Sequence, residues 1–200
     1  MSPEEGAKRR GKRELILEAA IRVFAERGFH AARVSDVAKE AGVADGTIYL
    51  YFKTKEEILL SIFEESMDTL REGLVARLAG MSDPLERVRI FARFHFEQVR
   101  TNPQVAEVLQ VELRLSKKFI KDYRPEKLWS YLGLFRQILQ EGQASGAIRA
   151  TVDPFVGMWA FFGALDEIAM QWALARNKDK FNLEAAADEV AEIFIRGLAR

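Results

Sequence analysis

Hydrophobic residues recur at helical spacing near the start of the chain. Between residues 15 and 24 they stand three and four positions apart, and Gly28 follows as a residue that can end a helix in the left-handed conformation. A second periodic set runs from Val34 to Ala41, with Gly42 after its last turn. The pattern therefore predicts two amphipathic helices, each followed by a glycine.

The next stretch, residues 42–52, predicts a helix too short to build a core. We expect its apolar side chains to face inward and its hydroxyl-bearing ones outward; these are Val43, Ile48 and Phe52, and Thr47, Tyr49 and Tyr51. The predicted arrangement is a helix, a turn with glycine and a second helix, supported by a helix upstream. In this arrangement the second helix lies in a DNA major groove. Thr47 and Tyr49 suit base edges, and Tyr51 and Lys55 suit phosphates. The alternative is a solvated face on a structural helix.

From Thr54 onward the sequence predicts a series of helices. Helix starts are indicated by capping residues and prolines at Thr54, Asp83, Asn102, Pro125, Asp153 and Asn182. Glycines predict helix ends near Gly80, Gly142 and Gly146, and no alternating strand pattern is present. We therefore predict an all-α fold of about nine helices. A helix-turn-helix domain would occupy residues 1–54, and an effector-binding and dimerisation domain residues 55–200.

The formal net charge of the chain is zero, but the charge is unevenly distributed. Residues 1–55 hold eleven Lys or Arg against eight acidic residues, a net charge of +3, so the remainder carries −3. Five of the basic residues lie between Lys8 and Arg13. This segment is either a flexible arm that follows the DNA backbone or enters the minor groove, or a solubilising tail. The modest net positive charge of residues 1–55 predicts a salt-dependent affinity for DNA.

The chain contains no cysteine, and residues 1–14 are too charged for a signal peptide. We therefore expect a cytoplasmic protein. The stretch from Phe155 to Ala175 has about the length of a membrane span, but Asp166 and Glu167 lie in its middle. We expect it to be a buried helix instead.

The last two predicted helices carry more apolar surface than a small bundle covers. Residues 155–175 are apolar nearly all round, and the final helix carries a stripe formed by Ala187, Val190, Ala191, Phe194 and Leu198. We expect these helices to pair with those of a second copy. A two-fold homodimer would present two recognition helices to a roughly palindromic site. The alternative is a monomeric core.

Aromatic residues are concentrated in the second part of the chain. Eleven of the fourteen phenylalanines lie beyond residue 60, and Phe91, Phe94, His95 and Gln98 fall on one face of a predicted helix. Spacing alone does not distinguish a filled core from the wall of a ligand cavity. His95 is likewise either a hydrogen-bonded core residue or a ligand contact.

Several short motifs together resemble the TetR family of bacterial transcriptional regulators over residues 12–60. They are Gly28-Phe29, Asp36-Val37-Ala38, Ala41-Gly42-Val43, Gly46-Thr47-Ile48-Tyr49, Tyr51-Phe52-Lys53 and Lys55-Glu56-Glu57. The resemblance implies a dimeric regulator that binds double-stranded operator DNA. The DNA contacts that we predict are Arg33, Ser35, Ala44, Asp45, Gly46, Thr47, Tyr49, Tyr51 and Lys55.

Two positions depart from the family pattern. The family often has a hydroxyl residue where this chain has Arg33 and Ala44. We expect Arg33 to contact a phosphate, with Ser35 or Asp36 serving the first turn of its helix. Ala44 offers no side-chain oxygen to the free amides of the recognition helix.

Residues 44–52, together with Glu112-Leu113-Arg114 and residues 163–167, resemble the branch that represses fatty-acid degradation genes and is released by long-chain acyl-CoA. An acyl chain needs an apolar tunnel, and the CoA phosphates need cations near its mouth. The effector-binding residues that we predict are Phe91, Phe94, His95, Gln98, Leu109, Leu113, Arg114, Phe135, Trp159, Phe162 and Asp166. Candidate cations are Arg114, Lys117, Lys118, Lys121, Arg124 and Lys127, which otherwise form a solvated helix face.

Two other functions are alternatives to this one. A regulator of the same architecture can control an efflux pump and respond to another hydrophobic ligand. A lipid-acting enzyme is a different class, but the chain has only two histidines, no Gly-x-Ser-x-Gly motif and no spaced set of metal ligands. Asp166 and Glu167 are adjacent and point in different directions on a helix, which disfavours an acid–base pair. We therefore predict no catalytic residue, no metal and no cofactor other than the effector.

Overall fold

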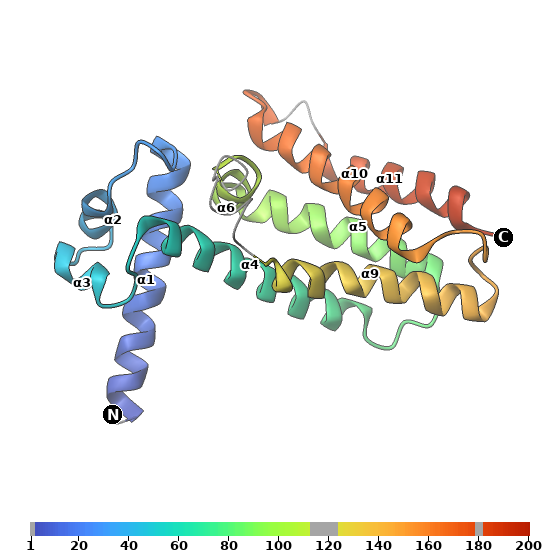
Figure 1. Ribbon diagram of the computed structural model, residues 1–200. Helices are drawn as coiled ribbons and strands as arrows, with labels where there is room; N and C mark the ends of the chain where they lie inside the picture. Colours follow the sequence, from blue (N-terminus) through green and yellow to red (C-terminus); the bar gives the residue numbers. More distant parts are fainter. Residues whose placement is uncertain (1–2, 113–123, 179–181) are drawn as a thin grey trace. The chain divides into compact units, whose positions relative to one another are not determined.

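The computed structural model describes residues 3–112, 124–178 and 182–200 (Figure 1). In chain order the elements are α1 (Pro3–Arg27), α2 (Val34–Glu40), α3 (Asp45–Tyr49), α4 (Lys55–Leu78), α5 (Pro84–Thr101), α6 (Pro103–Glu107), the π-helix η1 (Val108–Glu112), α9 (Glu126–Ser145), α10 (Pro154–Leu174) and α11 (Leu183–Leu198). Apart from an isolated bridge between Ile148 and Ala199, these ranges contain no β-structure. The predicted all-α class is confirmed.

Local capping explains most of the helix starts. Asp83, Asp153 and Asn182 each accept hydrogen bonds from backbone amides of the following turn, at 2.8–3.0 Å. The hydroxyl of Thr54 accepts from the amide of Glu57 at 3.1 Å. The predicted starts at these four residues are therefore confirmed, and α9 begins directly after Pro125 as expected.

Four of the five glycines predicted to end helices do so: Gly28, Gly42, Gly80 and Gly146 each follow a helix end within two residues and have positive φ. Gly80 and Gly146 have φ of +77°, the left-handed conformation that glycine adopts without strain. The prediction for Gly142 was wrong, because this residue lies inside α9 and is buried. A Cβ atom at Gly142 would stand 2.4 Å from Cδ1 of Ile148, so the glycine makes room for a packed side chain.

Contacts divide the chain into two compact units. Among the described residues, the first comprises 3–65 and 107–112, and the second 66–106, 124–178 and 182–200. Residues 55–65 of α4 belong to the first unit and the rest of α4 to the second. We predicted the domain boundary between residues 54 and 55, which is where α4 starts. The division by contacts falls later in the chain, between residues 65 and 66.

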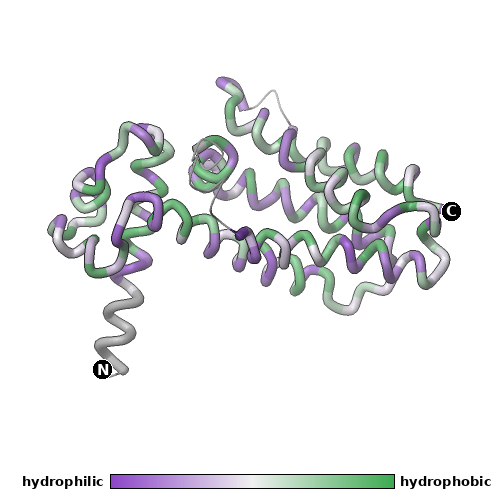
Figure 2. Tube along the Cα trace, viewed as in Figure 1, coloured by the Kyte–Doolittle hydropathy of each residue, from purple (hydrophilic) through white to green (hydrophobic). Residues whose placement is uncertain are grey.

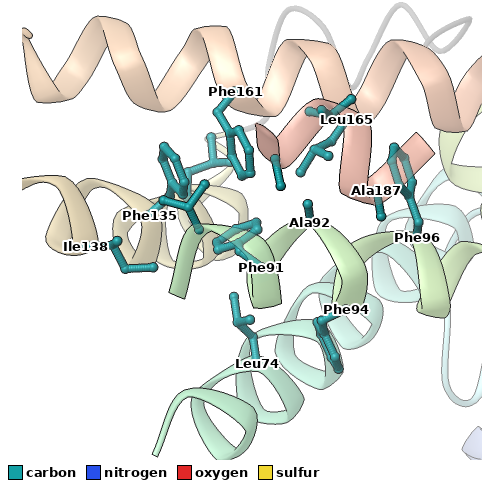
Figure 3. Packing of buried hydrophobic residues seen from close by; sticks show 14 of the residues in the cluster. Leu74, Phe91, Ala92, Phe94, Phe96, Phe135, Ile138, Phe161, Leu165 and Ala187 are labelled. Carbon is teal, nitrogen blue, oxygen red and sulfur yellow. The ribbon is translucent and has the colours of Figure 1, made fainter. Parts of the chain in front are cut away.

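In the second unit, α5 packs against α9, α10 and α11. Phe91 of α5 converges with Phe135 of α9 and Phe161 of α10 (Figure 3). The Phe135 and Phe161 rings stack with centroids 4.0 Å apart, and Phe91 meets both edge-on. Hydrophobic and hydrophilic residues alternate along the helices of both units, as amphipathic packing requires (Figure 2). Among the described helices none, α10 included, has the length and apolarity of a membrane span.

Candidate functional site

The first unit contains a helix-turn-helix formed by α2 and α3. Gly42 follows the end of α2 with φ of +67°, and its amide donates to the carbonyl of Lys39 at 3.2 Å. The amide of Val43 donates to the carbonyl of Ala38 at 3.0 Å. Together these two bonds form a Schellman motif, which ends α2 and reverses the chain towards α3.

Charged side chains fix α2 against α1. Arg22 pairs with Glu40 at 2.6 Å, and Arg27 pairs with Asp36 at 2.9 Å. The other carboxylate oxygen of Asp36 accepts from the backbone amide of Arg33 at 2.9 Å. Asp36 therefore serves the first turn of α2, as one of the two sequence alternatives predicted, and Arg33 and Ser35 are exposed.

The short helix α3 presents a mostly polar surface. Ala44, Asp45 and Gly46 are exposed, Tyr49 is 57 % exposed, and Thr47 and Tyr51 are half-buried. Ile48 is fully buried, as predicted, and so is Phe52, whereas Val43 is only half-buried. Ala44 caps no amide with its side chain, so the first turn of α3 retains free N–H groups.

The ammonium of Lys55, a predicted phosphate contact, is hydrogen-bonded within the first unit. Its Nζ donates to the carbonyl oxygens of Phe29, His30 and Ala32 at 2.6, 3.3 and 2.8 Å. The same ammonium lies 4.5 Å from the centroid of the Phe29 ring. Its donors are thus used within the first unit, where they join α4 to the loop after α1, and the predicted DNA contact is withdrawn.

The basic N-terminal segment also differs from the prediction. We expected a flexible arm or tail from Lys8 to Arg13, but the backbone is helical from Pro3 onward as part of α1. Arg13 pairs with Glu65 of α4 and lies over the Phe52 ring, 5.3 Å from its centroid. Arg13 is therefore a structural residue of the first unit.

The predicted effector residues of α5 point in different directions. Phe91 and Phe135 are packed in the core of the second unit. Phe94 lies instead against α4, where the Gly73 backbone makes room for its ring and the Arg77 guanidinium lies 5.6 Å from its centroid. Phe91 and Phe94 belong to one buried cluster, but Phe91 contacts aromatic rings of α9 and α10 whereas Phe94 contacts α4.

His95 is buried on α5 between α9 and α10. Its Nδ1 lies 3.1 Å from the hydroxyl of Tyr131, and its Nε2 has no hydrogen-bond partner among the described residues. Burial lowers the pKa of His95 from 6.5 to about 4, against an opposing effect of Asp166. Burial also raises the pKa of the Tyr131 hydroxyl above its usual range. Both groups are therefore neutral near pH 7.

A chain of aromatic contacts, the aromatic path, leads from His95 to the surface. Phe162 meets His95 with centroids 6.4 Å apart, and Trp159 meets Phe162 at 6.1 Å. Trp159 in turn contacts Trp129 at 5.3 Å, and Trp129 stacks on Phe155 at 6.1 Å. Trp129 and Phe155 are 44 % and 45 % exposed, so the path joins a buried polar group to solvent.

Sequence reasoning missed three residues of this region. Tyr131 stands four positions before Phe135 and shares its helix face, a spacing that would have placed it beside the predicted site. Trp129 and Phe155 flank the starts of α9 and α10, and only the packing of these helices brings them together.

The remaining predicted effector residues are spread more widely. Gln98 and Asp166 are half-buried in the second unit, and Leu109 lies on η1 in the first. Lys127 pairs with both carboxylate oxygens of Asp68 at 2.8 Å, so its ammonium already has a partner, whereas Arg124 is exposed. The other predicted residues lie outside the described part of the chain; they are Leu113, Arg114, Lys117, Lys118 and Lys121. Within the described ranges, no group of three or more His, Asp or Glu residues is arranged to hold a metal ion.

Comparison with known proteins agrees with this geometry. Residues 16–62 match the family described as bacterial regulatory proteins, tetR family, and residues 63–197 match the family described as YsiA-like protein, C-terminal region. The chain belongs to the TetR family. It is 37 % identical over 190 residues to the fatty acid metabolism regulator protein of Bacillus subtilis (strain 168), covering 95 % of this chain and 97 % of that protein.

Two solved structures of fatty-acid regulators are similar to this TetR-family protein over nearly its whole length. The fatty acid degradation regulator FadR from Bacillus halodurans has a TM-score of 0.86 and 36 % identity, with 100 % of this chain and 99 % of that chain covered. The transcriptional regulator FadR from Bacillus subtilis, in complex with stearoyl-CoA, has a TM-score of 0.85 and 37 % identity. That match covers 92 % of this chain and 98 % of the other. These relatives are transcriptional regulators of fatty-acid metabolism.

Proposed function

We propose that this TetR-family protein represses fatty-acid degradation genes and leaves its operator when it binds long-chain acyl-CoA. The observation that carries the proposal is the similarity, at 37 % identity and a TM-score of 0.85, to a FadR regulator in complex with stearoyl-CoA. The relatives are regulators, so the proposal assigns no catalysed reaction to the chain. A protein that binds operator DNA acts in the cytoplasm of a bacterial cell.

The helix-turn-helix supplies the DNA-binding half of the proposal. Exposed Tyr49 and half-buried Thr47 are the side chains of α3 that we assign to base edges. We assign phosphate contacts to Arg33, Ser35, Tyr51 and the first-turn amides around Asp45 and Gly46, where Ala44 leaves N–H groups free. These assignments replace the earlier one for Lys55.

A homodimer supplies the symmetry that a palindromic operator requires. α10 exposes Val156, Ala160 and Gly163 along one side, and α11 exposes Ile193. An open groove of about 530 Å³ between the two helices continues this surface. The predicted stripe of α11 faces the core instead, since Ala187, Val190, Ala191 and Leu198 are buried. The dimer surface that we propose is therefore the exposed side of α10 together with Ile193.

The second unit supplies the acyl-binding half. The apolar core of the second unit, which the aromatic path joins to solvent, suits a long hydrocarbon chain. Burial contributes about 0.8 kcal/mol per methylene, so affinity should rise by a few-fold with each added methylene until the space for the hydrocarbon chain is full. A coupling of about 1–3 kcal/mol between effector and DNA would change operator occupancy 5- to 150-fold.

The test is a DNA-binding titration by fluorescence anisotropy. The purified protein is titrated onto labelled promoter fragments of fatty-acid degradation genes, and stearoyl-CoA, free CoA or stearate is then added. We expect stearoyl-CoA to release the DNA and the two fragments of the ligand to have little effect. DNA affinity unchanged by saturating acyl-CoA would refute the effector part. Release by cationic dyes instead would favour a regulator of efflux.

A further inference from the structure

The buried pair of His95 and Tyr131 has an incomplete set of hydrogen bonds. A neutral imidazole has one nitrogen that donates and one that accepts. The Tyr131 hydroxyl is buried and protonated, and Nδ1 of His95, 3.1 Å away, is its partner in the described part of the chain, so we assign its O–H as the donor to Nδ1. The proton of His95 then resides on Nε2. This nitrogen is a buried donor without an acceptor in the described part of the chain.

The surroundings of His95 are mainly aromatic. Phe96, Tyr131 and Phe162 meet its ring with centroids 5.7, 6.3 and 6.4 Å away. A buried N–H without an acceptor is unfavourable in such surroundings, and native proteins rarely keep one without a reason. Phe162, which is half-buried, separates His95 from the exposed end of the aromatic path. Phe162 is the member of the path that lies against the His95 ring, so a ligand that enters along the path has to displace Phe162 to reach His95.

We propose that Nε2–H of His95 donates a hydrogen bond to the thioester carbonyl oxygen of the bound acyl-CoA, with Tyr131 fixing the donor tautomer. The inference rests on the proposed function. The hydrocarbon part of the ligand has no acceptor, and the thioester carbonyl is the first acceptor that follows it. His95 thereby sets the position of the acyl chain in the site, and Tyr131 acts as a positioning residue.

The experiment varies the ligand as well as the protein. Stearoyl-CoA is compared with octadecyl-CoA, the thioether in which CH₂ replaces the carbonyl, by calorimetric titration of the full-length protein. The thioether keeps the hydrocarbon chain, the pantetheine amides and the phosphates. We expect the wild-type protein to bind the thioester about tenfold more tightly, the ratio that one buried hydrogen bond supplies.

Three variants assign the preference to the pair. In His95→Phe, which fills the site without a donor, the ratio of the two affinities should fall to about one. In Tyr131→Phe the tautomer is no longer fixed, and the ratio should fall to an intermediate value. Val88→Ala removes buried volume two turns earlier on the same helix, and should leave the ratio at the wild-type value. Because each ratio is measured within one variant, a loss of stability common to both ligands cancels.

The outcomes separate the inference from the function on which it rests. Equal affinity of the wild-type protein for both ligands overturns the inference while acyl-CoA binding stands. A preference that persists in His95→Phe also overturns it, because another group then binds the carbonyl. Binding of neither ligand to the wild-type protein overturns the proposed function, and the inference with it.

Discussion

Single side chains in this protein have roles that depend on partners distant in the sequence. Lys55 is an example, because its ammonium reaches three carbonyl groups of the loop between α1 and α2. A lysine at the start of a helix beside a DNA-binding motif is readily interpreted from sequence as a phosphate contact. The carbonyl acceptors lie 23 to 26 positions earlier, and no local pattern indicates them.

Replacing Lys55 with methionine tests this structural role. The variant keeps much of the aliphatic stem but removes the donors, so we expect the free energy of unfolding to fall by about 1–3 kcal/mol. Chemical unfolding followed by circular dichroism measures the change. Lys53→Met, at an exposed neighbouring position, is the control and should change stability by less than about 0.5 kcal/mol. Equal effects of the two substitutions would contradict the structural role.

His95 makes the stability of the fold depend on pH. The unfolded chain takes up a proton on this residue near pH 6.5, whereas the folded protein does so only near pH 4. The unfolded state binds more protons in this window, so stability is retained above pH 6.5 and is lost as the pH falls towards 4. The loss amounts to about 3 kcal/mol.

Unfolding free energies of the wild-type protein and His95→Phe between pH 7.5 and 4 measure this contribution. Carboxylates whose pKa is lowered by ion pairs, such as Asp188 and Glu141, also make the unfolding free energy depend on pH, and they do so equally in both proteins. The difference between the two curves therefore isolates His95. Parallel curves would show that the histidine is not buried in the neutral state.

Helices illustrate which parts of the fold are predictable from sequence. The starts of α5, α10 and α11 are determined by Asp83, Asp153 and Asn182, whose oxygens bind amides two or three residues away. Such local interactions are visible as patterns. The surroundings of Gly142 and Phe94 are not visible as patterns, because they come from Ile148 and from α4, and these contacts exist only once the helices pack.

Two glycines of α9 give a matched test of this distinction. Gly142→Ala should destabilise the protein by about 1–3 kcal/mol, because the new Cβ stands 2.4 Å from Cδ1 of the buried Ile148. Gly133→Ala should stabilise it by up to about 1 kcal/mol, since no other atom lies within 4 Å of that Cβ and alanine favours helix. Thermal unfolding of both variants measures the two effects. Changes of the same sign would contradict the assigned packing.

The uncapped start of α3 allows a gain in stability. Ala44 already has the extended conformation of a capping residue, with φ of −71° and ψ of 148°. Ala44→Ser should supply an acceptor for the free amides and raise the stability of the first unit by about 1 kcal/mol. Thermal unfolding provides the measurement. Ala31→Ser, at an exposed loop position, serves as the control, and an equal gain there would exclude capping as the cause.

At the scale of the whole molecule, the amount of exposed apolar surface indicates an assembly. Val156 is 63 % exposed on α10, and Ile193 is 62 % exposed on α11. Sequence patterns correctly indicated surplus apolar surface on these helices. On α11 the sequence patterns assigned the exposed apolar surface to the wrong side of the helix. The predicted stripe is the side that packs against α5, and Ile193 lies on another side; sequence alone does not show which side meets α5.

Val156→Asp tests the assembly. The side chain is exposed in the protomer, so we expect the fold to persist while the dimer dissociates and operator affinity falls by at least tenfold. Light scattering coupled to size exclusion measures the mass, and anisotropy measures DNA binding. Val75→Asp, an exposed valine on α4, is the matched control. A dimeric Val156→Asp protein would place the subunit interface elsewhere.

The aromatic path also has an optical consequence. Two of the three tryptophans of the chain, Trp129 and Trp159, lie near its exposed end, whereas Trp172 is buried elsewhere on α10 beneath the Lys178 ammonium. Indole emission depends on the polarity around the ring, so a bound ligand that replaces water at Trp129 and Trp159 would shift their fluorescence to shorter wavelength. The protein thus contains a spectroscopic reporter of occupancy that requires no label, and Trp172 provides an internal reference.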